Sequence, residues 1–203
     1  MKKKFLTLLI LFLLSACGGK VNTAVPIPIA TEPPAVATEV VAQVTPVCIS
    51  SDPAQADIDR ALSFTGELFS APEWARSYTV ADGRVSVVWA NDPLGVVAYV
   101  ETLIFPCGYE EPDLNNFFND DNWGIIFANY DSFETVSACK IDEGLRLYEF
   151  EAVTAGFDFN IRYWAQNDTD NRVVGAMIVF PADSQALMDE YSERLFPELI
   201  SCP

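Results

Sequence analysis

A two-residue turn between two apolar strands is the feature that most constrains the fold. Asp82-Gly83 separates the β-prone residues 78–80 from residues 85–89. Asp-Gly favours a tight hairpin because both central residues tolerate a positive φ. A loop of this length predicts the register, with Val80 opposite Val85 and Tyr78 opposite Val87.

A second hairpin is predicted from residues 145–154 and 157–166, which flank Ala155-Gly156. Its register places Phe150 opposite Ile161 and Tyr148 opposite Tyr163 on one face of the sheet. The other face then carries Glu149 opposite Arg162 and Glu151 opposite Asn160. One face is therefore expected to be aromatic and the other charged, which is the consistency expected of a correct register.

Further elements surround the two hairpins. Strands are expected at residues 95–105 and 172–180, and helices are expected to begin near Pro53, Pro112 and Pro181, where proline suits the first turn. Strands joined by tight turns and followed by amphipathic helices predict an α+β fold, an antiparallel meander packed on helices as a two-layer or three-layer sandwich. Trp89-Ala90 to Phe105-Pro106 and Trp164-Ala165 to Phe180-Pro181 repeat at the same spacing, so an internal βββα duplication is a further hypothesis.

The N-terminus has the pattern of an export signal. Lys2, Lys3 and Lys4 precede the apolar run 5–14, which is too short to span a bilayer but has the length of a signal-peptide core. The run ends in Leu14-Ser15-Ala16-Cys17, which resembles the lipobox of bacterial lipoproteins. The resemblance implies that residues 1–16 are a signal peptide removed before Cys17, and that Cys17 is lipidated through its sulfur and its new N-terminus, with palmitate among the expected acyl groups.

Residues 17–47 are expected to form the lipidated cysteine and a tether rich in Pro, Thr, Ala and Val. Prolines 26, 28, 33, 34 and 46 remove hydrogen-bond donors and fix φ, which disfavours helices and central strands. In polyproline II form, at about 3.1 Å per residue, this stretch reaches up to roughly 90 Å. The sequence therefore predicts a spacer followed by one globular domain, residues 48–203.

The domain holds four cysteines, Cys48, Cys107, Cys139 and Cys202. An even number in an exported domain predicts two disulfides, and three pairings satisfy that count. The pairing we favour joins Cys48 to Cys202, stapling the ends of the domain, and Cys107 to Cys139. No CxxC pair is present, so the cysteines do not predict a zinc site.

Charge and composition exclude several functions. The chain has a formal charge of −17, which becomes −20 once residues 1–16 and their three lysines are removed. An acidic chain does not fit nucleic acid, whose binding depends on clustered Lys and Arg. The chain has no histidine, which removes His-based nucleophilic and metal sites. No nucleotide-binding or metalloprotease motif occurs either, so we predict no catalytic residues, no metal site and no cofactor.

An acidic and aromatic segment is the candidate binding surface. Adjacent carboxylates on a helix point in different directions, so pairs in the sequence do not predict the paired acids of a glycosidase. The alternative is a solvated acidic helix face over a core of Phe and Trp. The candidate residues are Glu110, Glu111, Asp113, Asp120, Asp121 and Trp123.

Residues 157–199 run through a long strand, a polar loop, a strand ending in Phe-Pro and an amphipathic helix. This order resembles the PsbP-like sandwiches of photosystem accessory proteins. The likeness covers about a quarter of the domain and includes no diagnostic motif. It implies binding or assembly rather than catalysis.

The sequence thus predicts a lipoprotein anchored in the cell membrane and facing the periplasm or the cell exterior. Its expected role is a non-catalytic module that binds a protein or a small molecule. A carboxylate-dependent hydrolase of cell-envelope polymers is one alternative. A calcium-binding module is another, although residues 167–171 lack the glycine and the closing glutamate of a calcium loop.

Overall fold

The computed structural model describes residues 52–81, 84–141, 144–169 and 171–203. The predicted signal peptide, the lipidated Cys17, the tether, Cys48 and the Asp82-Gly83 turn lie outside the described residues. Among the described residues, no helix is long and apolar enough to cross a membrane.

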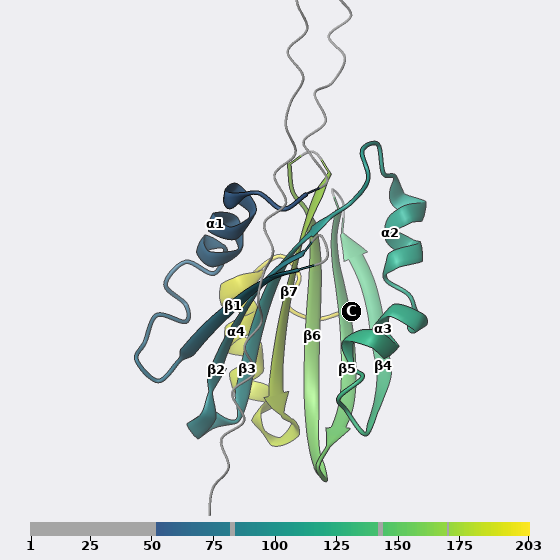
Figure 1. The fold of residues 1–203 in the computed structure, drawn as a ribbon. Helices are drawn as coiled ribbons and strands as arrows, with labels where there is room; N and C mark the ends of the chain where they lie inside the picture. Colours follow the sequence, from purple (N-terminus) through teal and green to yellow (C-terminus); the bar gives the residue numbers. More distant parts are fainter. Residues whose placement is uncertain (1–51, 82–83, 142–143, 170) are drawn as a thin grey trace, which may run out of the picture. The chain divides into compact units, whose positions relative to one another are not determined.

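Seven strands form one antiparallel sheet in the order β1-β2-β3-β7-β6-β5-β4 (Figure 1). The strands are β1 (Ala75–Ala81), β2 (Arg84–Asn91), β3 (Val96–Ile104), β4 (Ser132–Ile141), β5 (Leu145–Thr154), β6 (Phe157–Asn167) and β7 (Arg172–Pro181). The helices are α1 (Gln55–Ser63), α2 (Glu111–Phe117), α3 (Asp120–Ile126) and α4 (Gln185–Leu195), with 3-10 turns at Asp92–Leu94 and Ala182–Ser184. The predicted α+β class with an antiparallel sheet is confirmed.

Both hairpin registers are confirmed. Val80 pairs with Val85 and Tyr78 with Val87 between β1 and β2. Between β5 and β6, the residues opposite each other are Phe150–Ile161, Tyr148–Tyr163, Glu149–Arg162 and Glu151–Asn160. The turn chemistry and the alternation of side chains therefore determine these pairings locally.

The two faces of the sheet carry different clusters. Trp89 and Trp164 pack with Ala61 of α1 and Met188 of α4 in one apolar cluster. On the opposite face, a mainly aromatic cluster combines strand residues with Leu114 of α2 and Trp123 of α3. Its strand residues include Phe150, Ile161 and Tyr163. These residues lie on the face that the sequence predicted to be aromatic.

The charged pair predicted on the other face is present, but it lies beneath α4 on a face that is otherwise largely apolar and includes the buried Trp164. Arg162 is buried and donates to Glu149 of β5 at 3.0 Å and to Asp189 of α4 at 2.8 Å. It also donates to the hydroxyl of Ser192 at 2.8 Å. A buried guanidinium needs such partners, because a charge without them is costly in a low-dielectric interior. The predicted cross-strand pair thus also fixes α4 on the sheet.

The connection between the two halves differs from a simple meander. After β3 the chain passes through α2 and α3 to β4 at the far edge of the sheet, and β7 then returns beside β3. The helix expected to begin near Pro112 is α2, which ends at Phe117, and a second helix, α3, follows it. The break comes before Gly124, because Asn119 caps α3 by accepting the backbone N–H of Asn122 at 3.1 Å.

One disulfide joins Cys139 of β4 to Cys202, with Cα atoms 5.7 Å apart. This bond shows that the pairing favoured from the sequence is wrong, because Cys139 is not bonded to Cys107 and Cys202 is not bonded to Cys48. Cys107 is disulfide-bonded as well. The reason is topological: β4 lies at the edge of the sheet near the C-terminal residues, since the backbone N–H of Cys202 reaches Glu149 of the neighbouring strand β5 at 3.3 Å.

A buried ion pair attaches α1 to β7. Arg172 donates from Nε and Nη2 to the two carboxylate oxygens of Asp57, at 3.0 and 3.2 Å. Both side chains are almost completely buried. Asn171 accepts a further hydrogen bond from Arg172 at 2.6 Å, so the guanidinium is held on two sides. The fork of Arg matches a carboxylate in geometry, which makes this contact directional as well as charged.

Candidate functional site

The first acidic residues of the predicted binding surface serve the start of α2. Glu110 is the residue that precedes the helix, and its backbone N–H donates to the carboxylate of Asp113 at 2.8 Å. Such a bond satisfies a main-chain donor that the helix itself cannot. Asp113 is therefore engaged in capping.

Glu111 connects α2 to the sheet. Its carboxylate accepts hydrogen bonds from Lys140 of β4, at 2.9 Å, and from the buried Arg146 of β5. The hydrogen bond from Lys140, followed by the charge of Arg146, lowers the pKa of the Glu111 carboxyl. Arg146 also donates to Asn115 of α2 at 3.0 Å. Glu111 is thus the counter-ion of two strand cations.

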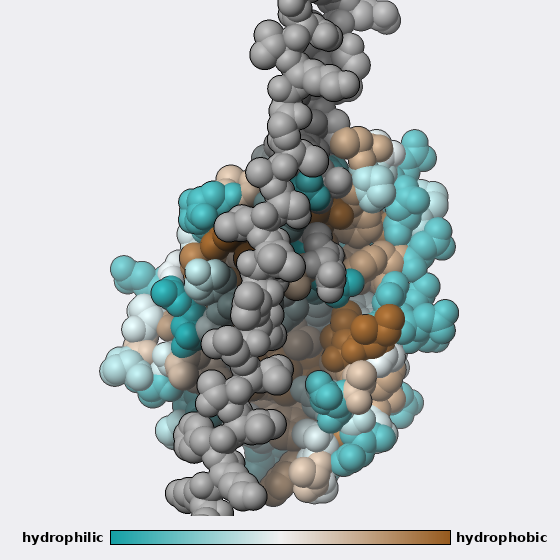
Figure 2. Space-filling view, in the orientation of Figure 1, coloured by the Kyte–Doolittle hydropathy of each residue, from teal (hydrophilic) through white to brown (hydrophobic). Residues whose placement is uncertain are grey.

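The remaining predicted residues divide between solvent and core. Asp120 and Asp121 are exposed in the first turn of α3, where carboxylates suit the positive end of the helix dipole. Trp123 is only 2% exposed, and its ring lies 4.9 Å from both Tyr148 and Phe150. Figure 2 shows hydrophilic residues along the outer side of α2 and α3. The six residues therefore do not form one acidic and aromatic surface.

Sequence reasoning missed a buried polar cluster on the same face of the sheet. Glu101 of β3 is 1% exposed and accepts hydrogen bonds from Tyr163 at 2.6 Å and from Tyr99 at 3.2 Å. Burial raises the pKa of the Glu101 carboxyl, although the Tyr163 hydrogen bond, the charge of Arg84 and the Tyr99 hydrogen bond act in the opposite direction. The available signal was an acid inside a stretch of β3 that has no other charge.

The cluster around Glu101 is closed to solvent and does not have the form of a catalytic site. Both oxygens of Glu101 are engaged by tyrosine hydroxyls, and Tyr99 shares its hydroxyl with Ser86 at 2.8 Å. A general acid must come within hydrogen-bond reach of the group that it protonates. A side chain that is 1% exposed does not meet a large substrate, so we assign Glu101 a structural role.

Two hollows lie where the β5–β6 hairpin turns. The hollows, of about 540 and 510 Å³, share Asp158, Phe159 and Ala182 in their linings. Four carboxylates line them, and no Lys or Arg of the described residues does so. We call this region the hairpin-end surface, and its chemically distinct residues are Glu134, Glu151, Phe157, Asp158, Phe159, Asn160, Pro181 and Asp183.

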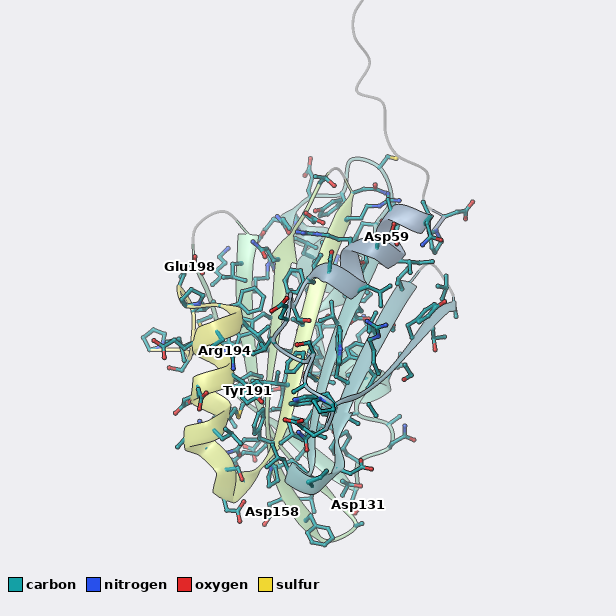
Figure 3. All side chains as sticks on the ribbon, turned by 90° about the vertical axis from the view of Figure 1, so that its left-hand side faces the viewer. Asp59, Asp131, Asp158, Tyr191, Arg194 and Glu198 are labelled. Atoms are coloured by element: carbon teal, nitrogen blue, oxygen red, sulfur yellow. A yellow bond between two sulfur atoms is a disulfide. The ribbon has the colours of Figure 1, made fainter. Side chains whose placement is uncertain are left out.

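Phe157 is the outstanding residue of the hairpin-end surface, because its side chain is 69% exposed. The turn that presents it is held in place: Ala155 has a positive φ of 51°, and its N–H donates to Asp131 at 2.8 Å. Figure 3 shows Asp131 and Asp158 together at this lower end of the sheet, whereas Asp59 and Glu198 lie toward the upper end. An exposed aromatic ring beside carboxylates suits contact with a partner that carries apolar and basic groups.

Two carboxylates of this surface stand directly opposite each other, Glu134 on β4 and Glu151 on β5. Both side chains are exposed and lie side by side on neighbouring strands. A glycosidase instead holds its two carboxyl groups on either side of the scissile bond, with one of them in surroundings that raise its pKa.

Among the described residues, no group of three or more acidic or cysteine side chains is placed to hold a metal ion. No protein-family model matches the chain, and no curated protein is similar enough in sequence to be identified as a relative.

Proposed function

We propose that this chain is a lipid-anchored, extracytoplasmic binding and assembly module without catalytic activity, which contacts a partner protein through the hairpin-end surface. The observation that carries the proposal is Phe157, a large apolar ring that is 69% exposed beside two shallow hollows. Burying such a ring at an interface is favourable because apolar area leaves water. The four carboxylates that line the two hollows favour a partner with basic side chains.

The partner contact is tested by affinity capture with two matched variants. Phe157→Ser removes the exposed ring, and Ile125→Ser removes an apolar side chain of the same 69% exposure on α3. We expect wild type and Ile125→Ser to retain the same partner from a membrane extract of the source organism. The amount of partner retained by Phe157→Ser is expected to be at least tenfold lower. Equal capture by both variants would place the contact elsewhere.

Membrane attachment through Cys17 is supported by the lipobox and has its own test. Each buried methylene of an acyl chain contributes about 0.8 kcal/mol, and stable anchoring needs more than one chain. The Cys17→Ser variant is therefore expected to move from the membrane fraction to the soluble fraction after cell breakage. A variant that stays in the membrane fraction through a carbonate wash would rule out the lipid anchor.

The alternative to this proposal is the carboxylate-dependent hydrolase, although the side-by-side arrangement of its nearest carboxylates differs from that of a glycosidase. Glu134 and Glu151 face each other in the larger hollow, with Asp158 also in its lining. Release of sugars from cell-envelope polymer by wild type but not by Glu151→Gln would favour this function over binding. The calcium-binding alternative is tested by thermal unfolding with added calcium, since an ion that binds only the native state raises the midpoint.

We also propose that the domain is a three-layer sandwich, with helices on both faces of the sheet. This architecture is supported by the packing of α1 and α4 in one cluster and of α2 and α3 in the other. The internal duplication is supported by Trp89 and Trp164, which belong to the same cluster, whereas the helices that follow the two repeats join different clusters. Superposition of residues 84–104 on residues 159–179 in an experimental structure tests it, because equivalent repeats must place Trp89 on Trp164.

A further inference from the structure

The two edge strands of the sheet, β4 and β1, differ in the features that prevent pairing with another chain. Strand β4 has a register irregularity between Thr135 and Ser137, carries Glu134 and Lys140, and is cross-linked through Cys139 to the C-terminal residues. Bulges and charges of this kind are how proteins prevent a sheet edge from pairing with another chain. The β4 edge is therefore protected.

The β1 edge lacks these devices. Its register with β2 is regular over its whole length, and all seven residues are exposed, including Tyr78 at 59% and Val80 at 44%. The strand contains no proline, no lysine and no acid, and Arg76 is its single charge. A regular, exposed and nearly uncharged edge is a template for another strand.

The orientation of the free main-chain groups follows from the hairpin. Ala81 and Arg84 flank a two-residue loop and pair with each other, so they form a hydrogen-bonded pair. Hydrogen-bonded and non-hydrogen-bonded pairs alternate along an antiparallel ladder. Arg76, Tyr78 and Val80 therefore belong to non-hydrogen-bonded pairs, and their N–H and C=O groups point away from β2. No strand of the described residues pairs with this side of β1, so these three residues present the unused half of the ladder at the edge.

We propose that β1 pairs antiparallel with β1 of a second copy of this chain, with Tyr78 on the two-fold axis. The strand reads Ala-Arg-Ser-Tyr-Thr-Val-Ala, which is nearly symmetric about Tyr78. In this register Tyr78 lies opposite Tyr78 of the second copy and Arg76 lies opposite Val80, so every outward-facing residue meets another outward-facing residue. Each such pair exchanges both of its main-chain hydrogen bonds.

The side chains fit the same register. Ser77 lies opposite Thr79 of the second copy on one face, where hydroxyl pairs are favourable across strands. On the other face the exposed rings of the two Tyr78 residues are neighbours. Charge also selects this edge in a strongly acidic protein, because β1 brings no carboxylate to the contact, whereas the edge strand β4 carries Glu134. The result is an isologous dimer with one continuous sheet.

This inference rests on the proposed assembly role and names a second copy as one partner. Its test is oxidative cross-linking of the full-length lipoprotein in its membrane. Tyr78→Cys places two thiols opposite each other at about 5.5 Å between Cα atoms, within disulfide reach. Thr79→Cys is the matched control, because its own copies are diagonal neighbours at about 7–8 Å, beyond that reach.

We expect at least tenfold more covalent dimer with Tyr78→Cys than with Thr79→Cys. Ser77→Cys and Thr79→Cys chains are expected to cross-link when they are expressed together but not separately. Adding Val80→Lys to Tyr78→Cys is expected to reduce the amount of covalent dimer, because an edge lysine opposes strand pairing. An unchanged midpoint of thermal unfolding would show that this variant still folds.

Equal cross-linking by Tyr78→Cys and Thr79→Cys, no cross-linking by Tyr78→Cys, or cross-linking to a different protein would overturn the self-pairing. Partner capture that depends on Phe157 would then still support the proposed function. Conversely, a Tyr78-linked dimer without any captured partner would retain the self-pairing and reject the hairpin-end surface as a partner contact.

Discussion

Asp57→Ala is expected to lower the free energy of unfolding by about 3–5 kcal/mol, because it leaves the buried Arg172 without its carboxylate. The two side chains form a forked ion pair between α1 and β7, and both are almost fully removed from water. Asn171 remains as a neutral partner but does not compensate the charge. Urea unfolding at neutral pH, followed by tryptophan fluorescence, measures the loss.

Two variants make this expectation specific to the buried charge. Arg60→Ala breaks an ion pair with Asp168 in which Arg60 is 47% exposed, and exposed pairs contribute about 0–1 kcal/mol. Asp57→Ala combined with Arg172→Met removes both charges and is expected to recover much of the stability. If Asp57→Ala costs no more than Arg60→Ala, the buried pair does not hold α1 on the sheet.

The same pair gives stability a defined dependence on pH. Burial raises the pKa of the Asp57 carboxyl, but the hydrogen bond from Arg172, the Ala54 N–H and the charge of Arg172 together lower it below the ordinary 3.8. Since the native pKa is the lower one, the contribution is present above pH 3.8 and is lost as the pH falls through the native value. The stability difference between wild type and Asp57→Ala is therefore expected to shrink below about pH 4.

Gly175→Ala is expected to destabilise the protein by about 1–3 kcal/mol or more, through overpacking at the centre of the sheet. A Cβ atom at Gly175 would overlap the hydroxyl oxygen of Tyr163 and would lie 2.8 Å from the ring carbon Cζ and 3.0 Å from Cγ of Glu101. Both neighbours are buried, and they are hydrogen-bonded to each other, so neither has space to move. Chemical denaturation with matched m-values measures the change.

Gly124→Ala is the matched control, because a Cβ atom there meets nothing within 4 Å and the residue lies inside α3. Alanine in a helix is favoured over glycine, so we expect this variant to be more stable by about 0.5–1 kcal/mol. Tyr163→Phe should recover part of the loss of Gly175→Ala by removing the overlapping oxygen. A Gly175→Ala protein as stable as wild type would show that the cluster is not tightly packed.

Local patterns predicted the hairpins correctly, including which residues face each other. The pairs Phe150–Ile161 and Glu149–Arg162 follow from turn length and from the two-residue period of a strand, and both are properties of a short segment. The edge strand β4 was not predicted. Strand β4 is exposed along most of its length, so its residues carry little of the alternating burial from which strands are recognised.

The candidate site was predictable only in part. The acidic character of residues 110–121 is evident from the sequence, but the assignment of Glu111 to Arg146 and of Trp123 to the core depends on strands that come later in the chain. Phe157 was predicted as the start of a strand, but its exposure depends on how far the helices extend over the sheet.

The sequence by itself determined the antiparallel hairpins, the pairing of Phe150 with Ile161 on one face and of Glu149 with Arg162 on the other, and the acidity of the domain. Each depends on residue type and on neighbours within one turn or one strand pair. Only the tertiary structure decided the Cys139–Cys202 bond, the burial of Glu101 beneath two tyrosines and the unprotected edge at β1. These depend on the order of strands in the sheet, which brings β7 beside β3 and places β4 and β1 at opposite edges. Strand order arises from long-range packing of whole faces, which no local pattern in the chain encodes.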